Sequence, residues 1–235
     1  MSGNTAEGHI AQAFDDDLEA INKLLHRMAT TAAEQLSMAT RAFDSGDLDT
    51  AKTVIEADAM VDQLEKEVHD MIVRVIARRQ PMAVDLRELI SSLQISTYLE
   101  RVGDYAKNIA RRTRTLEGSD ASAKVRKALV EMGEMAEGLL RSVMEARLKR
   151  DAALALSVWE ADAELDELHT EAHARILKFM RKNPDQLEDA AHLLMIAKNF
   201  ERIGDHCTNI AEEIHFHILG EAPPDNRPKT DEVGK

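Results

Sequence analysis

Glycine, proline and aromatic residues are scarce in this 235-residue chain, which has 10 glycines, 5 prolines and 3% aromatic residues. Turn-rich folds such as β-sandwiches and β-barrels need glycine and proline at many positions, so the shortage argues against them and favours an all-helical fold. A single cysteine, Cys207, excludes a disulfide within the chain. Its place among the apolar residues of a helix predicts a small buried side chain rather than a nucleophile.

Excess positive charge and long apolar runs are also missing. The formal net charge is −13. This charge argues against the basic face that sequence-independent nucleic-acid binding requires, and it suits metal cations or basic partner surfaces. The chain opens with no signal peptide, and it contains no run of about 20 apolar residues. We therefore expect a cytoplasmic protein that reaches the inner membrane only through partners.

Six amphipathic segments make up most of the sequence. Apolar residues recur every three or four positions within them, and Asp47, Asp120 and Asp151 stand where helix caps are expected. The expected helices follow the acidic residues 15–17, then run over 48–79, 84–116, from Asp120 onward, 151–182 and 187–219. We predict an all-α fold of two tandem, internally duplicated antiparallel three-helix bundles. The bundles cover 14–117 and 119–219, and a disordered tail covers 220–235.

The two bundles are predicted to be copies of one another. The segment Glu100-Arg-Val-Gly-Asp104-Tyr-Ala-Lys-Asn108-Ile-Ala110 returns as Glu201-Arg-Ile-Gly-Asp205-His-Cys-Thr-Asn209-Ile-Ala211. Upstream, residues 55–69 align in the same way with residues 159–173. Agreement over two helices in each half indicates an internal duplication.

Each half carries two stripes of acidic residues, because helical residues four apart lie one turn above each other. The stripes are Asp58, Asp62, Glu65 and His69 with Glu100, Asp104 and Asn108 in the first half, and Asp162, Asp166, His169 and His173 with Glu201, Asp205 and Asn209 in the second. Residues equidistant from the turn of an antiparallel hairpin lie at the same level. Pro81 is midway between Asp58/Asp62 and Glu100/Asp104. Pro184 adjoins the midpoint between Asp162/Asp166 and Glu201/Asp205. Both pairs are therefore predicted to meet.

Four carboxylates at one level repel each other and favour binding of a cation. Carboxylate oxygens with nearby imidazole suit iron, manganese, zinc or magnesium, and bridging carboxylates can hold more than one divalent or trivalent ion. The predicted metal ligands are Asp58, Asp62, Glu100, Asp104, Asp162, Asp166, Glu201 and Asp205. Further candidates, as ligands or as hydrogen-bonding neighbours of ligands, are Glu65, His69, Asn108, His169, His173 and Asn209. The alternative is a set of ion pairs, and Arg101 and Arg202 are interpreted as partners of this kind.

These motifs resemble those of the PhoU family. The specific matches are Arg79-Gln-Pro81 with Asp85-Leu-Arg87, then Leu99 to Asp104 with Asn108 to Ala110, and Phe200 to His206 with Asn209 to Ala211. The resemblance spans nearly the whole chain and implies paired three-helix bundles with multinuclear iron or zinc clusters on the eight acids named above. Tyr98 and Tyr105 depart from the family pattern where the second half keeps Asn199 and His206. We therefore expect the second metal site to be the stronger one, with His206 as another candidate ligand.

The resemblance also implies a function. PhoU proteins are negative regulators of phosphate uptake and phosphate-starvation signalling, and they link the phosphate ABC transporter to a membrane sensor histidine kinase. A protein of this kind is a metal-binding adaptor, expected here as a homodimer, and not an enzyme. Two alternatives remain: a ferritin-like carboxylate-bridged metalloenzyme, and a metal-free helical scaffold. The first needs Glu-x-x-His motifs in one bundle, but Asp166-x-x-His169 and Glu212-x-x-His215 lie on separate helices, the latter far from Glu201.

Overall fold

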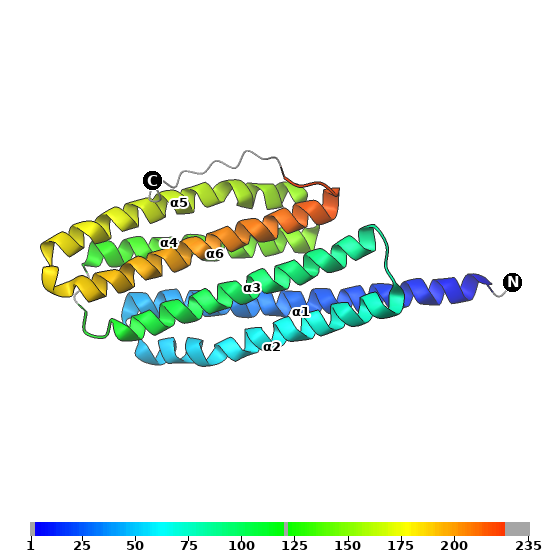
Figure 1. Ribbon diagram of the computed structural model, residues 1–235, viewed down its shortest axis with the longest axis horizontal. Helices are drawn as coiled ribbons and strands as arrows, with labels where there is room; N and C mark the ends of the chain where they lie inside the picture. Colours follow the sequence, from blue (N-terminus) through cyan, green and yellow to red (C-terminus); the bar gives the residue numbers. More distant parts are fainter. Residues whose placement is uncertain (1–2, 120–121, 224–235) are drawn as a thin grey trace.

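Six long helices form the structure (Figure 1). The computed structural model describes residues 3–119 and 122–223, with side chains described from residue 12 onward. The helices are α1 (Gly3–Ser45), α2 (Leu48–Arg79), α3 (Val84–Thr115), α4 (Ala123–Lys149), α5 (Ala152–Lys182) and α6 (Leu187–Leu219), with one 3-10 turn, η1 (Pro184–Gln186), before α6. The described part of the chain contains no strand, so the all-α prediction is confirmed.

Two of the three predicted helix caps are confirmed. The Asp47 carboxylate accepts hydrogen bonds from the N–H groups of Asp49 and Thr50, each at 3.1 Å. Asp151 caps α5 in the same way. The N-cap of α4 is Ser122, whose hydroxyl accepts from the N–H of Val125, so the prediction that Asp120 caps this helix is wrong. Asp120 itself lies outside the described residues. Residues 224–235 of the predicted disordered tail also lie outside the described residues.

The first helix begins earlier than predicted. The sequence favours a start at residues 15–17, but α1 already begins at Gly3. The stretch 3–14 contains three alanines, one glutamate and one glutamine, which favour a helix, beside two glycines, which do not. The acids at 15–17 therefore lie inside the helix, where Asp17 forms an ion pair with Arg79 of α2 at 3.1 Å.

The two three-helix units lie side by side along their length (Figure 1). Helices α1, α2 and α3 pack on one another, and so do α4, α5 and α6. The units meet where α3 packs on α6 and α1 packs on α4. Among the described residues, α2 contacts only α1 and α3, and α5 contacts only α4, α6 and η1. The outer helices α2 and α5 therefore each bring their acidic stripe against one inner helix, α3 or α6.

Close backbone approach holds the units together. A Cβ atom added at Gly133 of α4 would lie 2.6 Å from Thr40 Oγ1 of α1 and 3.0 Å from Phe200 Cε1 of α6. Gly133 thus lets three helices pack without a gap, and the apolar core continues from one unit into the other.

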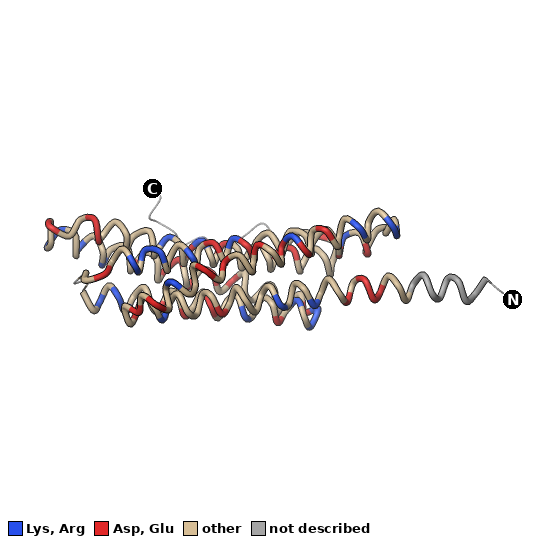
Figure 2. The backbone as a smooth tube through the Cα atoms, turned by 90° about the horizontal axis from the view of Figure 1, so that it is seen from below, with Lys and Arg blue, Asp and Glu red and all other residues tan. Residues whose placement is uncertain are grey.

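Charges of both signs alternate along the helices in the view of Figure 2. Several of the exposed charges form pairs four residues apart on one helix, such as Glu19 with Lys23 and Glu137 with Arg141. Within residues 3–119 and 122–223, no helix is both long enough and apolar enough to cross a membrane.

Candidate functional site

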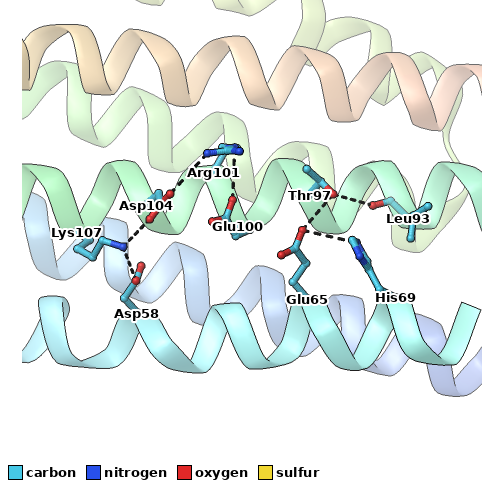
Figure 3. Close-up of polar contacts among 9 residues, drawn as sticks. All are labelled: Asp58, Glu65, His69, Leu93, Thr97, Glu100, Arg101, Asp104 and Lys107. Atoms are coloured by element: carbon cyan, nitrogen blue, oxygen red, sulfur yellow. Dashed lines mark hydrogen bonds and ion pairs between the residues drawn. The ribbon is translucent and has the colours of Figure 1, made fainter.

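The acidic stripes of α2 and α3 meet at the predicted level, and a lysine lies between them. Lys107 Nζ donates to Asp58 Oδ2 and to Asp104 Oδ1, each at 2.5 Å (Figure 3). Burial acts to lower the pKa of Lys107, but its hydrogen bonds to Asp104 and Asp58 raise the pKa above the ordinary value of 10.5. The ammonium group is therefore fully charged at neutral pH and joins the two helices as an internal cation.

The other two acids of the first half have elevated proton affinity. Burial, with the charge of Asp104, raises the pKa of Glu100 to about 7. Burial and the charge of Asp58 raise the pKa of Asp62 as well. Arg101 lies 3.5 Å from Glu100 and 3.8 Å from Asp104, which confirms its interpretation as an ion-pair partner. The repulsion expected from the sequence is therefore only partly offset by the basic residues.

Glu65 and His69 lie closer to the α2–α3 turn and contact hydroxyl groups instead of the acids. The Thr97 hydroxyl donates to Glu65 Oε1 at 3.1 Å (Figure 3). His69 Nε2 lies 3.1 Å from Ser96 Oγ. His69 Nε2 is also 3.6 Å from Glu65 Oε1. Both candidates therefore form a polar contact between α2 and α3, separate from the lysine bridge.

The corresponding acids of the second half are more deeply buried. The exposed fraction is 1% for Asp162, 7% for Asp166, 5% for His169 and 6% for Glu201. Gly204 of α6 creates the space for this packing, since a Cβ at that position would collide with Asp162 Oδ1 and with Leu165. The Asp162 side chain of α5 therefore lies directly against the α6 backbone at Gly204.

Glu201 carries an incompletely satisfied carboxylate. Its Oε1 accepts from Lys198 Nζ at 2.6 Å, whereas its Oε2 is buried without a hydrogen-bond partner in the described structure. Burial is the main cause that raises the pKa of Glu201, although Lys198 acts in the opposite direction. Arg202 lies 3.5 Å from Asp205 and 3.9 Å from Glu201, as its interpretation as an ion-pair partner predicts.

The remaining candidates lie around these acids at different positions. The ring centroid of His173 is 6.4 Å from that of His169 on α5. Asn108 and Asn209 are half-buried one turn beyond Asp104 and Asp205.

His206 faces the other unit, which differs from its expected place beside the α5 acids. Its ring stacks on Tyr98 and Tyr105 of α3, with centroid distances of 5.7 and 5.6 Å. Burial lowers the pKa of His206, so the ring is neutral at pH 7. The physical reason is the packing of α3 on α6, which covers this side of the helix. The tyrosines that depart from the family pattern thus form an aromatic contact between the units.

The two halves differ in how well they fit a metal ion. Within the described residues, no group of three or more Asp, Glu, His or Cys side chains is arranged to hold an ion. In the first half Lys107 lies between Asp58 and Asp104, where a metal would have to bind, so this half does not fit. The second half has Thr208 in place of that lysine. Its donor chemistry fits, because Asp162, Asp166, Glu201 and His169 are all buried and Glu201 Oε2 accepts no hydrogen bond in the described structure.

Lys107 and Lys198 are the site residues that the sequence interpretation missed. Each stands three residues from an acid of its own helix, a spacing that places the two side chains side by side. Lys107 and Asp58 are also nearly equidistant from the α2–α3 turn. Lys107 was therefore predictable from its distance to the turn, as the acids were.

Comparisons with known proteins agree with the duplication. The family profile described as "PhoU domain" matches twice, at residues 25–113 and 129–214. The chain is 37% identical over 226 residues to a protein from Rhizobium meliloti, covering 96% of this chain and 95% of that protein. It is 38% identical over 223 residues to one from Caulobacter vibrioides, covering 95% and 97%. Both are named "Phosphate-specific transport system accessory protein PhoU homolog".

Solved structures show the same fold. The crystal structure of PhoU from Pseudomonas aeruginosa is similar with a TM-score of 0.85 and 31% identity, covering 88% of this chain and 100% of that chain. The phosphate transport system regulatory protein PhoU from Streptococcus pneumoniae is similar with a TM-score of 0.82 and 25% identity, covering 90% and 99%. None of these names describes an enzyme, in agreement with the expectation that this chain is not one.

Proposed function

The chain belongs to the PhoU family, and from this premise we propose that it is an accessory protein of a phosphate transport system that represses phosphate uptake and phosphate-starvation signalling. The observation that carries the proposal is full-length similarity in both halves to relatives named as accessory proteins of phosphate-specific transport. The protein acts by binding, as an adaptor between a phosphate ABC transporter and a membrane sensor histidine kinase. It reaches the membrane through these partners, and a homodimer is the expected assembly.

Metal binding belongs to the second half in this proposal. Asp162, Asp166, Glu201 and Asp205 are the ligands, with His169 and His173 as neighbours. Burial of several acidic groups in one place is costly, and a bound divalent or trivalent ion would add positive charge there. The support is the 1% exposure of Asp162 and the buried Glu201 Oε2 atom, which accepts no hydrogen bond in the described structure. The α5 and α6 side chains hold the ion between two helices, so its presence changes how firmly that pair is joined.

A metal-free scaffold is the second candidate, and the lysines favour it. Lys107 already neutralises part of the first acidic cluster, and Lys198 contacts Glu201 in the second. The ferritin-like alternative finds less support. Glu212 accepts from the Trp159 indole at 3.1 Å, and His215 Nδ1 lies 3.1 Å from the Glu221 carbonyl oxygen, so both residues of that motif have structural contacts.

A complementation experiment tests the regulatory function. The gene is deleted, and a reporter of phosphate-starvation genes is followed in phosphate-rich medium. Under the proposal the reporter stays on in the deletion strain and is repressed again by the wild-type protein. Normal repression in the deletion strain, with no second PhoU-like protein present, contradicts the regulatory function.

The Asp162→Asn/Asp205→Asn double variant then separates the regulator from the metal. Repression by a folded variant that has lost its metal supports a scaffold whose signalling needs no ion. Failure of a folded, metal-free variant to repress supports a metal-dependent regulator. Sedimentation of the purified wild-type protein tests the homodimer independently.

A further inference from the structure

A half-enclosed cavity of about 120 Å³ lies between the two units, away from the acidic stripes. Helices α1, α3, α4 and α6 all contribute to its wall, which is lined by Asn22, His26, Glu88, Met144, Arg147, Leu148, Arg150, Ile214, His217 and Ile218. A volume of this size holds roughly four water molecules or one small ligand. In a chain with a net charge of −13, this wall carries two arginines and two histidines against one carboxylate.

The carboxylate in the cavity already has its partners. Arg150 donates from one guanidinium nitrogen to both oxygens of Glu88, at 2.9 and 3.0 Å. His217 Nε2 lies 3.5 Å from Glu88 Oε2. The His217 contact, aided by Arg150, outweighs burial and lowers the pKa of Glu88 to about 2. Glu88 is therefore ionised at neutral pH, and Arg150 is the cation that forms hydrogen bonds to it.

Arg147 supplies a second positive charge whose hydrogen-bond partners are neutral. It donates to Asn22 Oδ1 at 2.9 Å and to Ser92 Oγ at 2.8 Å. Burial lowers the pKa of Arg147 to about 10, so the guanidinium is still charged at pH 7. A guanidinium has five N–H donors, and these two bonds come from a single nitrogen. The cavity thus has one more positive than negative charge, with N–H groups to spare.

We propose that this cavity binds a small oxyanion, of the class of inorganic phosphate, through Arg147 with Arg150, His217 and His26. Planar guanidinium groups match the oxygens of tetrahedral oxyanions, and the histidines and the Asn22 amide add further N–H donors. Because the wall includes both units, a bound anion joins α1 and α3 to α4 and α6. Its binding therefore strengthens the contact between the halves. The inference depends on these side chains alone and stands apart from the metal and regulatory proposals.

Calorimetric titration of the full-length protein with sodium phosphate tests the inference, with sodium sulfate and sodium chloride at matched ionic strength as comparisons. EDTA is present throughout, so that a bound metal cannot capture the phosphate. The expected result is saturable, one-to-one phosphate binding that chloride does not reproduce. Equal binding of sulfate also supports an oxyanion site, one selected by charge and shape. The absence of saturable binding of either oxyanion overturns it.

Variants locate the site. Arg147→Gln removes the charge but keeps a hydrogen-bonding side chain, and it should weaken phosphate binding by about tenfold or more. Arg141→Gln is the matched control, because Arg141 lies on the same helix in an exposed pair with Glu137 and should bind phosphate like the wild type. Arg147→Lys keeps the charge without the planar fork, so it gives intermediate affinity and serves as the folded variant if Arg147→Gln does not fold. Affinity unchanged in a folded Arg147 variant, or lost equally in the control, refutes the assignment.

Discussion

Replacement of Lys107 by methionine removes the ammonium group that joins α2 to α3. The side chain of Lys107 is 16% exposed and that of Asp58 10%, so the ion pair is largely shielded from water. Methionine keeps the length and the apolar part of the side chain, so the change acts mainly on charge. Asp58 and Asp104 are then left facing each other, with Asp62 and Glu100 close by.

The magnitude follows from the burial of the pair. Removing one partner of a fully buried ion pair costs about 3–5 kcal/mol, and exposed pairs contribute about 0–1 kcal/mol. Asp104 is 29% exposed, so the site lies between these limits. We expect Lys107→Met to lower the free energy of unfolding by about 2–3 kcal/mol at pH 7.5. For a chain of this length that corresponds to a decrease in melting temperature of about 4–12 °C.

Urea unfolding followed by circular dichroism measures the change, in EDTA and with Lys66→Met as the control. Lys66 is exposed on α2, the helix that carries Asp58, and its replacement should change stability by less than about 0.5 kcal/mol. Adding Mn²⁺ should restore stability to Lys107→Met and not to the control, since a metal ion can take the place of the ammonium group. A Lys107→Met protein as stable as Lys66→Met would refute the structural role of the lysine bridge.

Three further predictions concern the acidic helix pairs. Gly204→Ala should destabilise the protein by about 1–3 kcal/mol, because the new methyl group meets Asp162. Gly138→Ala has open space around it and should stabilise the protein by about 0.5–1 kcal/mol, and thermal unfolding compares the two variants. Glu100, with its pKa raised to about 7, keeps a proton in the folded state that the unfolded state loses above about pH 4.5, so stability should fall as pH rises through this window. Glu100→Gln should therefore flatten the dependence of unfolding free energy on pH by at most about 3 kcal/mol between pH 4.5 and 7, and an unchanged slope would argue against this assignment. EDTA should lower the melting temperature while far-ultraviolet circular dichroism stays helical, because each buried apolar side chain contributes about 1.5–3 kcal/mol and the core is continuous; loss of helicity would show that metal holds the fold.

The helices and their pairing were predictable from the sequence because they depend on local patterns. Apolar periodicity located the predicted helix 48–79, and α2 has these bounds. The counting of levels about Pro81 brought Asp58 to the height of Asp104, where Lys107 now joins them. An antiparallel hairpin has little freedom in register once its turn is known, so this prediction needed no knowledge of the rest of the fold.

The contacts between the units were not predictable in the same way. A stripe fixes the angle of a side chain about its helix axis, but it does not say which neighbouring helix covers that angle. His206 and Asp205 are adjacent in sequence, yet the His206 ring packs on Tyr98 and Tyr105 of the other unit. Glu88 of α3 likewise accepts hydrogen bonds from Arg150, which lies 62 residues later in the sequence. Such pairs follow only from the side-by-side packing of the units.

We propose that the duplicated acidic helix pairs are neutralised differently, by Lys107 in the first half and by a metal ion in the second. The most direct test is the metal content of protein purified without chelator or affinity-tag metal, measured by mass spectrometry. Wild type and Asp58→Asn/Asp104→Asn are predicted to retain the same metal per chain, while Asp162→Asn/Asp205→Asn loses it. Equal metal loss in the two double variants, or a metal-free wild type, would contradict the claim.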